Sequence, residues 1–330
     1  MSQTKTPDKS IPNKCKLIYN PNAGKKRKTF AGEKGVALEE IKDLLVQYQI
    51  DVDLFPTKKA GHATKLAKDA IEEGYSTVLV AGGDGTVGEV ANGLIGTDIT
   101  LGILPLGTFM NVARMLSIPN DLEKAVLIIK NGRSRKIDVG CISHMSGKKL
   151  ADSHYFLESA GIGIEAEFHQ HFLEFENGSY SAIVSLVKKF IDNFRDKITL
   201  TLDDEEIKTF ASLITISNGP YTGAALKVAP NAKLNDHRLT VSIFKMGHRE
   251  IINYFMKLAR VGAAESRKVV THQAKTVKIA SKNKLLMHAD GRVFGTTPVE
   301  FSVIPNALSV ITGFPKPEES ALVKRTILDP

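Results

Sequence analysis

Apolar and polar positions follow two different rhythms along the chain, and the change falls near Arg133. Before it, short apolar runs alternate with stretches whose apolar residues recur every three to four positions. Such runs are typical of buried strands, and the longer spacing is typical of amphipathic helices. Alternation of the two predicts a mostly parallel sheet with helices on both faces.

The elements expected in this first segment follow from the runs themselves. Four strands are expected at 15–20, 50–55, 76–83 and 100–107. Helices are expected at 33–49, 62–74, 86–96, 109–116 and 122–132. Gly74 is expected just beyond the end of the second helix, where glycine commonly adopts a left-handed conformation.

Beyond Arg133, short segments with a period of two dominate, and two helical stretches at 180–194 and 248–262 interrupt them. Many antiparallel strands with few helices predict a β-sandwich-like domain. We therefore divide the chain into a flexible lead-in (1–12), an α/β domain (13–137), a sandwich-like domain (138–313) and a tail (314–330). The tail is expected to form a short helix or to fold back onto the first domain.

Composition agrees with two folded domains. The chain has 330 residues, of which 42% are hydrophobic and 24% charged, and single cores stop growing at roughly 250–300 residues. No apolar run reaches the roughly 20 residues that span a bilayer, and the polar N-terminus has no apolar core of a secretory signal. The two cysteines, Cys15 and Cys141, cannot make a disulfide framework. We expect a cytoplasmic protein.

The net charge of +8 favours anionic partners. Trp is absent and aromatic residues make up only 7%, so a base-stacking surface for nucleic acid is not visible. A membrane surface or a nucleotide therefore remains as the expected anionic partner. The cations at 25–28, with Lys188 and Lys189, would suit anionic lipid headgroups, although a solvated face explains them more simply.

A glycine-rich stretch, "VLVAGGDGTVGEV" at 78–90, joins an expected strand to an expected helix. Ligands of open α/β sheets bind at the carboxyl ends of strands, and three further loops, at 19–26, 55–63 and 105–114, leave such ends. Glycine N–H groups can approach a phosphate, with Thr86 capping the next helix. Asp84 would repel a phosphate unless a divalent cation, Mg²⁺ by chemistry, lies between them. The spacing matches neither the dinucleotide-binding fingerprint nor the P-loop.

Here the sequence resembles a known family. "GGDGTVGEVANGL" looks like the GGDGTxxEvxNG signature of the diacylglycerol kinase and sphingosine kinase superfamily of lipid kinases. NAD kinases and phosphofructokinases carry related turns. Further matches follow in the family's order over about residues 15–312: "YNPNAG", "TKKAGHATKLA", "PLGTFMNVARMLSIP", "KIDVG", "FLESAGIGIEAE", "VAPNAKLNDHRLTV" and "HADGR".

The resemblance implies an ATP- and Mg²⁺-dependent lipid kinase of lipid metabolism and phospholipid biosynthesis, with the nucleotide in the interdomain cleft. It implies a phosphofructokinase- or NAD-kinase-like first domain and a lipid substrate at a membrane surface. Asp84 would act near the phosphates and Asp290 would be the general base, while Asp236 and the neighbouring backbone at Arg238 would hold a metal. Nucleotide-binding residues would be Asn20, Gly24, Thr57, Gly82, Gly83, Asp84, Gly85, Thr86, Val87, Gly88, Glu89 and Thr108.

The chain departs from the family pattern at several positions. Arg292 replaces the glutamate of the DGE motif, and His237 replaces the glycine of the metal-binding DG loop. Met110 and Asn111 replace Asn and Asp of the GTxND motif, and Glu158 replaces the Asn of FxNxxxxG. These changes would either tune the site for a more acidic substrate or weaken the activity.

Two rival functions remain open at this point. An NAD kinase would use the same turn with a different acceptor. A nucleotide- or lipid-binding protein with weak or absent catalysis would fit the changes at Arg292, Met110 and Asn111. Nucleic acid is not an expected partner, and homodimer formation is left open.

Overall fold

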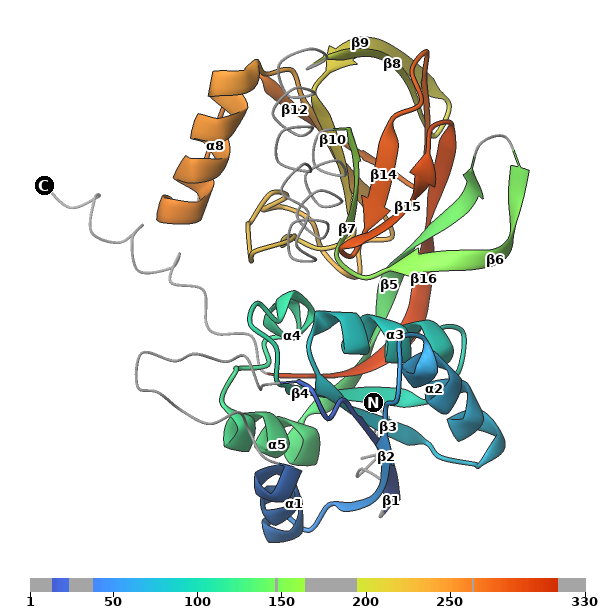
Figure 1. Ribbon diagram of the computed structural model, residues 1–330, viewed down its shortest axis with the longest axis vertical. Helices are drawn as coiled ribbons and strands as arrows, with labels where there is room; N and C mark the ends of the chain where they lie inside the picture. The colour runs from blue at the N-terminus through green and yellow to red at the C-terminus, as the bar shows by residue number, and fades with distance from the viewer. Residues whose placement is uncertain (1–13, 24–37, 146–147, 164–194, 263, 314–330) are drawn as a thin grey trace, which may run out of the picture.

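A computed structural model of the chain describes residues 14–23, 38–145, 148–163, 195–262 and 264–313. Two halves are stacked on one another, the N-terminal half below and the C-terminal half above (Figure 1). The lead-in at 1–12, Gly24, the cations at 25–28, the expected helix at 180–194 and the tail at 314–330 lie outside the described residues.

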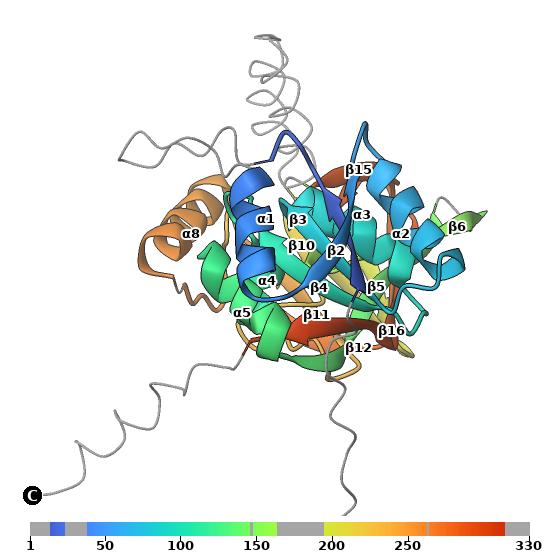
Figure 2. The ribbon, with the colours of Figure 1, turned by 90° about the horizontal axis from the view of Figure 1, so that it is seen from below.

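The N-terminal half confirms the expected alternation of strands and helices. Its strands, all parallel, follow the order β2-β1-β3-β4, and they are β1 (Lys14–Tyr19), β2 (Asp51–Pro56), β3 (Thr77–Gly82) and β4 (Thr100–Pro105). The helices are α1 (Leu38–Gln47), α2 (His62–Glu72), α3 (Asp84–Leu94), α4 (Asn111–Met115) and α5 (Leu122–Asn131). Helices α1 and α5 lie on one face of the sheet and α2 and α3 on the other (Figure 2). Gly74 has the expected left-handed conformation, with φ 77°.

The C-terminal half confirms the sandwich of antiparallel strands. One sheet has the order β12-β11-β10-β7-β14-β15, and β13, β8 and β9 extend the other sheet from β16. An apolar core of aliphatic residues with Phe156 and Phe301 fills the space between the sheets. The elements are β5 (Arg133–Met145), β6 (Lys148–Phe156), β7 (Ser159–Gly163), β8 (Asp196–Leu202), β9 (Glu205–Ala211), β10 (Leu213–Ser217), β11 (Leu239–Phe244), α8 (His248–Val261), β12 (Val269–Ala274), β13 (Thr276–Ser281), β14 (Leu286–Ala289), β15 (Arg292–Thr296) and β16 (Val299–Thr312).

Two long strands, β5 and β16, run through both halves, and this revises the expected boundaries. The expected division after residue 137 falls inside β5. The end of β16 pairs in parallel with β4, through Ser309 with Thr100 and Val310 with Leu101. Residues 308–312 therefore complete the sheet of the first half, although the sequence assigned them to the second. The two halves share one continuous ten-stranded sheet.

The glycine-rich stretch forms a shorter turn than the sequence suggested. Helix α3 begins at Asp84 with Gly83 as its N-cap residue, two residues before the expected start. Thr86 therefore lies inside the first turn of the helix, and its expected capping role is wrong. No helix in the described part of the chain is both long and apolar enough to cross a membrane.

Candidate functional site

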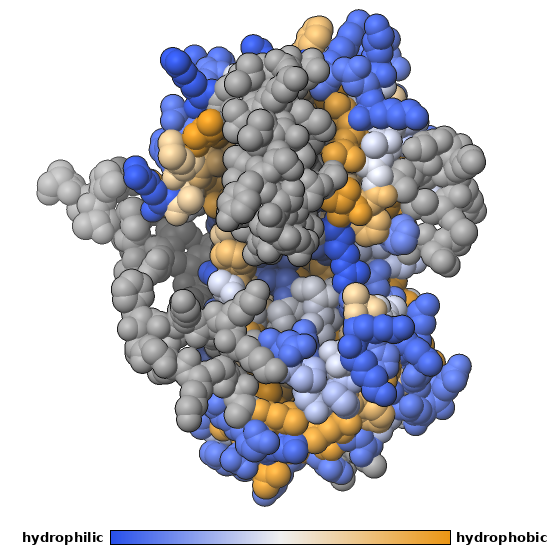
Figure 3. Space-filling view, in the orientation of Figure 1, coloured by the Kyte–Doolittle hydropathy of each residue, from blue (hydrophilic) through white to orange (hydrophobic). Residues whose placement is uncertain are grey.

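Two adjoining cavities lie where the halves meet, at the carboxyl ends of the parallel strands. The larger has a volume of about 850 Å³ and is lined by residues of both halves. The smaller, of about 360 Å³, is lined mainly by loops that follow β1 and β2. Gly85, Glu89 and Arg292 line both cavities, so the two form one cleft with a shared wall. Hydrophilic side chains gather at this level of the surface (Figure 3).

The smaller cavity has a basic lining. It contains Lys58 and Lys59 from the β2–α2 loop together with Arg292, and among the described residues Glu89 is its one acidic side chain. Asn20 and Thr57 line it as predicted. The Asn20 side-chain amide donates to Thr86 Oγ1 at 3.4 Å, which joins the end of β1 to the first turn of α3. This arrangement suits a polyanion such as a nucleotide phosphate chain.

The glycines that follow β3 and β4 have two separate structural roles. A Cβ on Gly82 would lie 2.7 Å from Cβ of Thr86, and a Cβ on Gly107 would lie 2.8 Å from Cα of Gly83. Gly82 and Gly107 therefore allow the turns after β3 and β4 to pack closely. Gly85 and Gly88 face open space and line the cleft, where a ligand can approach their backbone.

Asp84 lies in the larger cavity and faces the start of α4. The Val112 N–H donates to Asp84 Oδ1 at 3.3 Å. Burial raises the pKa of Asp84, and the N–H groups of residues 110–112 offset part of that rise. A carboxylate at the start of two helices is close to the partial positive charge of both.

Asp290 lies in the tight turn between β14 and β15 and reaches the same cavity from the C-terminal half. Its Oδ2 accepts the Leu157 N–H at 2.7 Å, and its Oδ1 accepts those of Glu158 and Ser159 at 3.0 and 3.1 Å. Burial raises the pKa of Asp290 to about 6, although these three hydrogen bonds lower it. Its left-handed φ of 43° fits a two-residue hairpin turn. Asp290 is therefore both an ordinary residue of a hairpin turn and a residue of the cleft.

Behind these two acids, Glu158 and Asn111 form a buried pair. Asn111 Nδ2 donates to Glu158 Oε2 at 2.7 Å and to the Gly223 carbonyl at 2.8 Å. Burial and the negative charges of Asp290 and Asp84 raise the pKa of Glu158 well above its usual value. The sequence flagged both positions as departures from the family pattern without relating them, and the fold makes them partners.

The wall between the cavities is an ion pair that joins the two halves. Arg292 Nη2 lies 2.7 Å from Glu89 Oε1, and the same oxygen accepts the Gly61 N–H at 2.9 Å. Glu89, on α3, is 91% buried, whereas 54% of the Arg292 side chain is exposed. Arg292 is therefore accessible from the cleft, which it lines on both sides of the wall.

Several predicted site residues lie elsewhere. Val87 is fully buried in the core of the first half, so its side chain cannot contact a nucleotide. Thr108 is exposed and lines neither cavity. Asp236 and Arg238 also line neither cavity, so the expected joining of Asp236 with Asp84 and Asp290 in one acidic set stays a prediction. Gly24 lies outside the described residues. The acid that does join Asp84 and Asp290 is Glu158.

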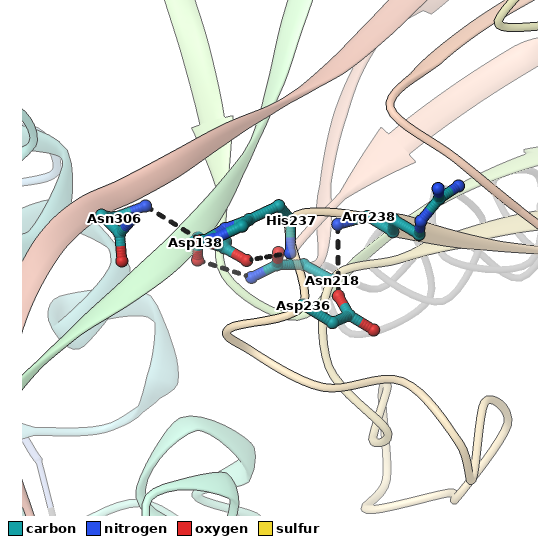
Figure 4. Close-up of polar contacts among 6 residues, drawn as sticks. All are labelled: Asp138, Asn218, Asp236, His237, Arg238 and Asn306. Carbon is teal, nitrogen blue, oxygen red and sulfur yellow. Dashed lines mark hydrogen bonds and ion pairs between the residues drawn. The ribbon is translucent and has the colours of Figure 1, made fainter.

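Asp138, a buried residue of β5, organises the loop that carries Asp236 (Figure 4). Its Oδ2 accepts the His237 N–H at 2.7 Å, and its Oδ1 accepts the Asn306 N–H at 2.9 Å and lies 2.9 Å from His237 Nδ1. His237 has a φ of 59°, so it keeps the left-handed conformation that the glycine of the family pattern would adopt easily.

The carboxylate of Asp236 points away from Asp138 and accepts the Arg238 N–H of its own loop at 3.2 Å (Figure 4). No group of three or more acidic, histidine or cysteine side chains with metal-binding geometry occurs among the described residues. The metal role of Asp236 and Arg238 stays a prediction.

Sequence reasoning missed Lys58, Lys59 and the ion pair of Arg292 with Glu89. A signal for the two lysines was present, because they directly follow the carboxyl end of a predicted strand. No comparable signal exists for the ion pair, whose members are 203 residues apart.

Comparison with known families assigns both halves. The diacylglycerol kinase catalytic domain matches residues 14–142. The YegS C-terminal NAD kinase beta sandwich-like domain matches residues 158–312. Diacylglycerol kinases of Staphylococcus aureus strains bovine RF122 and Newman are each 28% identical to this chain over 300 residues, which cover 87% of this chain and 89% of theirs.

Solved structures agree with this assignment. A protein of Bacillus anthracis strain Sterne, described as a candidate diacylglycerol kinase, superposes with a TM-score of 0.70 at 25% identity and covers 91% of this chain and 98% of its own. A diacylglycerol kinase structure from the same strain, at 22% identity with a TM-score of 0.68, supports the fold. The motifs, both domain matches and the shared fold thus agree: residues 14–142 match the diacylglycerol kinase catalytic domain, and the chain is similar to diacylglycerol kinases over most of its length.

Proposed function

We propose that the protein transfers the γ-phosphoryl group of ATP, with Mg²⁺, to the hydroxyl of a lipid of the diacylglycerol type at a membrane surface. The observation that carries the proposal is the pairing of Asp84 and Asp290, one from each half, in a cavity that adjoins a basic one. The basic cavity suits the nucleotide phosphates, and the larger cavity suits the acceptor.

The larger cavity has the features of an acceptor site. Its volume lies within the roughly 300–1,000 Å³ of small-molecule sites. Ile71, Ile95 and Phe294 give it apolar surface against which the start of an acyl chain would pack. The acidic side chains of the cavity, Asp84 and Asp290 among them, lie where a hydroxyl would be oriented.

The side chains of the cleft fit a magnesium ion that arrives on the nucleotide. Mg²⁺ in kinases is held by one or two carboxylates and the substrate phosphates and keeps several waters. Asp84, at the start of α3 beside the open backbone of Gly85, supplies one such carboxylate. When bound, the ion would neutralise charge on the phosphates.

Asp290 is placed to accept the acceptor's proton. Its pKa of about 6 leaves it ionised at neutral pH yet basic enough to accept a proton. In the transfer, the bond between the γ-phosphorus and the ADP oxygen breaks and a bond to the lipid oxygen forms. The hydroxyl proton passes to the Asp290 carboxylate, and ADP leaves.

The experiment is phosphorylation of a lipid panel in mixed micelles with labelled ATP, followed by mass spectrometry of the lipid extract. NAD serves as a separate acceptor in a parallel reaction. We expect a phosphorylated lipid from the wild-type protein and at least a 100-fold lower rate from Asp84→Asn and Asp290→Asn. Equal rates in all three proteins would refute the site, and NADP as the sole product would make the protein an NAD kinase.

A further inference from the structure

Arg292 stands at the point where a basic and an acidic part of the cleft meet. On one side lie Lys58 and Lys59 of the smaller cavity, and on the other side lie Asp84 and Asp290 of the larger. In the described part of the chain, Glu89 is the one hydrogen-bond partner of the guanidinium. Since a guanidinium has five N–H donors, most of them remain available to an anion.

The fold holds Arg292 in place from two directions. Ala289 pairs with Arg292 across the two-residue turn of the β14–β15 hairpin, and the Asp290 carboxylate ties that turn to the N–H groups of residues 157–159. The ion pair with Glu89 then fixes the far end of the side chain beside the first turns of α3. A preorganised arginine loses little freedom when it binds a phosphate.

The neighbouring backbone indicates which anion would come there. Gly85 lines both cavities and faces open space at the N-terminus of α3, where backbone N–H groups favour a phosphate. A nucleotide that enters from the Lys58 side would have its terminal phosphate nearest the acidic cavity, next to Arg292.

We propose that Arg292 contacts the terminal phosphate of the nucleotide and neutralises the charge that grows on it during transfer. This rests on the proposed function, since it names the residue that does so at the same site. Arg292 would thus act as an arginine supplied by the second half of the same chain, and Glu89 would be its positioning residue. In the sequence, position 292 has lost the glutamate of the family pattern. The arginine in its place would instead contribute a positive charge to the reaction.

The first test measures nucleotide binding without any acceptor. Isothermal titration of wild type and Arg292→Gln with Mg²⁺–ATP and Mg²⁺–ADP gives the preference for the terminal phosphate. We expect wild type to bind ATP about 10-fold more tightly than ADP and Arg292→Gln to lose most of that preference, because one charge-assisted contact of this kind is worth roughly a factor of ten. Arg292→Lys, which keeps the charge, should retain part of it.

A double variant separates contact from simple charge neutralisation. Without Arg292, the buried Glu89 carboxylate would itself repel phosphate, so Arg292→Gln alone has two effects. Glu89→Gln combined with Arg292→Gln removes that repulsion. If Arg292 contacts the phosphate, the double variant still shows no ATP preference. Recovery of the wild-type preference in the double variant would overturn the proposal.

The second test uses turnover on the lipid found by the panel. Arg292→Gln should lower kcat on the order of 10²–10³-fold with a smaller change in KM for the lipid, and Arg292→Glu should be worse because it faces Glu89. A change confined to the lipid KM, or a gain of activity in Arg292→Glu, would refute the proposal. Melting temperatures of all variants monitor folding. If wild type phosphorylates no acceptor while the ATP preference still depends on Arg292, the proposed function and the role of Arg292 in transfer both fail, whereas its contact with the terminal phosphate stands.

Discussion

Three carboxyl groups of the cleft show how position alone changes the chemistry of one functional group. Burial raises the pKa of Asp84, Glu158 and Asp290, but different hydrogen bonds offset part of the rise in each group. Asp84 faces helix N–H groups, Asp290 accepts three backbone N–H groups, and Glu158 has one side-chain amide. Glu158 therefore holds its proton most readily, whereas Asp290 is poised near neutral pH.

The Asp290 carboxyl group should determine how the rate falls on the acidic side of the pH–rate profile. Activity needs the ionised form, so kcat/KM should rise about 10-fold per pH unit below an inflection near pH 6 and level off above it. A pH–rate profile on the lipid substrate measures this. An inflection near pH 4 would contradict the role of burial.

The raised pKa of Asp290 affects stability in the opposite direction: stability falls with rising pH, whereas activity rises. Folding raises the pKa of Asp290, so its contribution to the free energy of unfolding is fully present below pH 4 and is lost as pH rises through about 6. Asp290→Asn should flatten that part of the stability curve in urea denaturation between pH 4 and 7. A curve that Asp290→Asn leaves unchanged would contradict this contribution.

The Asn111–Glu158 pair should behave as one unit. The family pattern has its acid at position 111 and its amide at position 158, so this chain carries the two groups transposed. Asn111→Asp would replace the amide that donates to Glu158 at 2.7 Å and to the Gly223 carbonyl with a second buried acid, and it should cost about 3 kcal/mol of unfolding free energy. Adding Glu158→Asn should restore most of it.

Urea denaturation of the two single variants and the double variant measures the coupling. Independent sites would add, whereas groups in one hydrogen bond couple by about 0.5–3 kcal/mol. Strict additivity would show that the transposition has no structural meaning.

At the scale of elements, helices α2 and α3 approach closely because of one glycine. A Cβ on Gly93 would lie 2.6 Å from Cβ of Ala67 and 2.7 Å from the Thr64 carbonyl oxygen. This contact brings α2 and its loop against α3, and with them Gly61 against Glu89. The position of the ion-paired wall therefore depends on how tightly two helices pack.

Gly93→Ala should destabilise the protein by about 1–3 kcal/mol, because the two helices must separate to admit the methyl group. Gly88→Ala is the matched control in the same helix, since its Cβ would meet nothing within 4 Å. There the helix preference of alanine should add up to about 1 kcal/mol. Thermal denaturation of both variants decides, and equal changes in the two would refute the packing argument.

At the scale of the whole molecule, the cleft exists because β5 and β16 hold the halves in one sheet. Asp138 lies on β5 at the crossing and accepts N–H groups from the His237 loop and from Asn306 on β16. Its side chain is 1% exposed. One buried carboxylate thus ties together the segments on which both halves depend.

Asp138→Ala should lower the unfolding free energy by about 3 kcal/mol, because it removes the buried acceptor of the His237 and Asn306 N–H groups. Asp236→Ala, on the same loop with only a local contact, should cost no more than about 0.5 kcal/mol. Urea denaturation measures both. A loss of similar size in the two would show that Asp138 does not hold the junction.

Much of this molecule was predictable from local pattern. The apolar run Val78–Ala81 is typical of a buried strand, and the spacing of Ile41 and Leu45 is typical of the buried face of a helix. The structure confirms both elements. Asp84 and Asp290 were found because glycine turns at strand ends and the motifs around them are local in sequence. The side chain of Val87 is buried although the motif includes it, because a motif spans successive residues of a helix and only one face of that helix meets the cleft.

The sequence by itself determined the order of elements, the family resemblance and the two acids of the cleft, since these depend on residues near one another along the chain. Only the tertiary structure decided the rest. It placed residues 308–312 in the first half's sheet, joined Asn111 to Glu158, and set Arg292 against Glu89. Contacts between distant residues depend on how whole strands register and pack, and no local pattern encodes them.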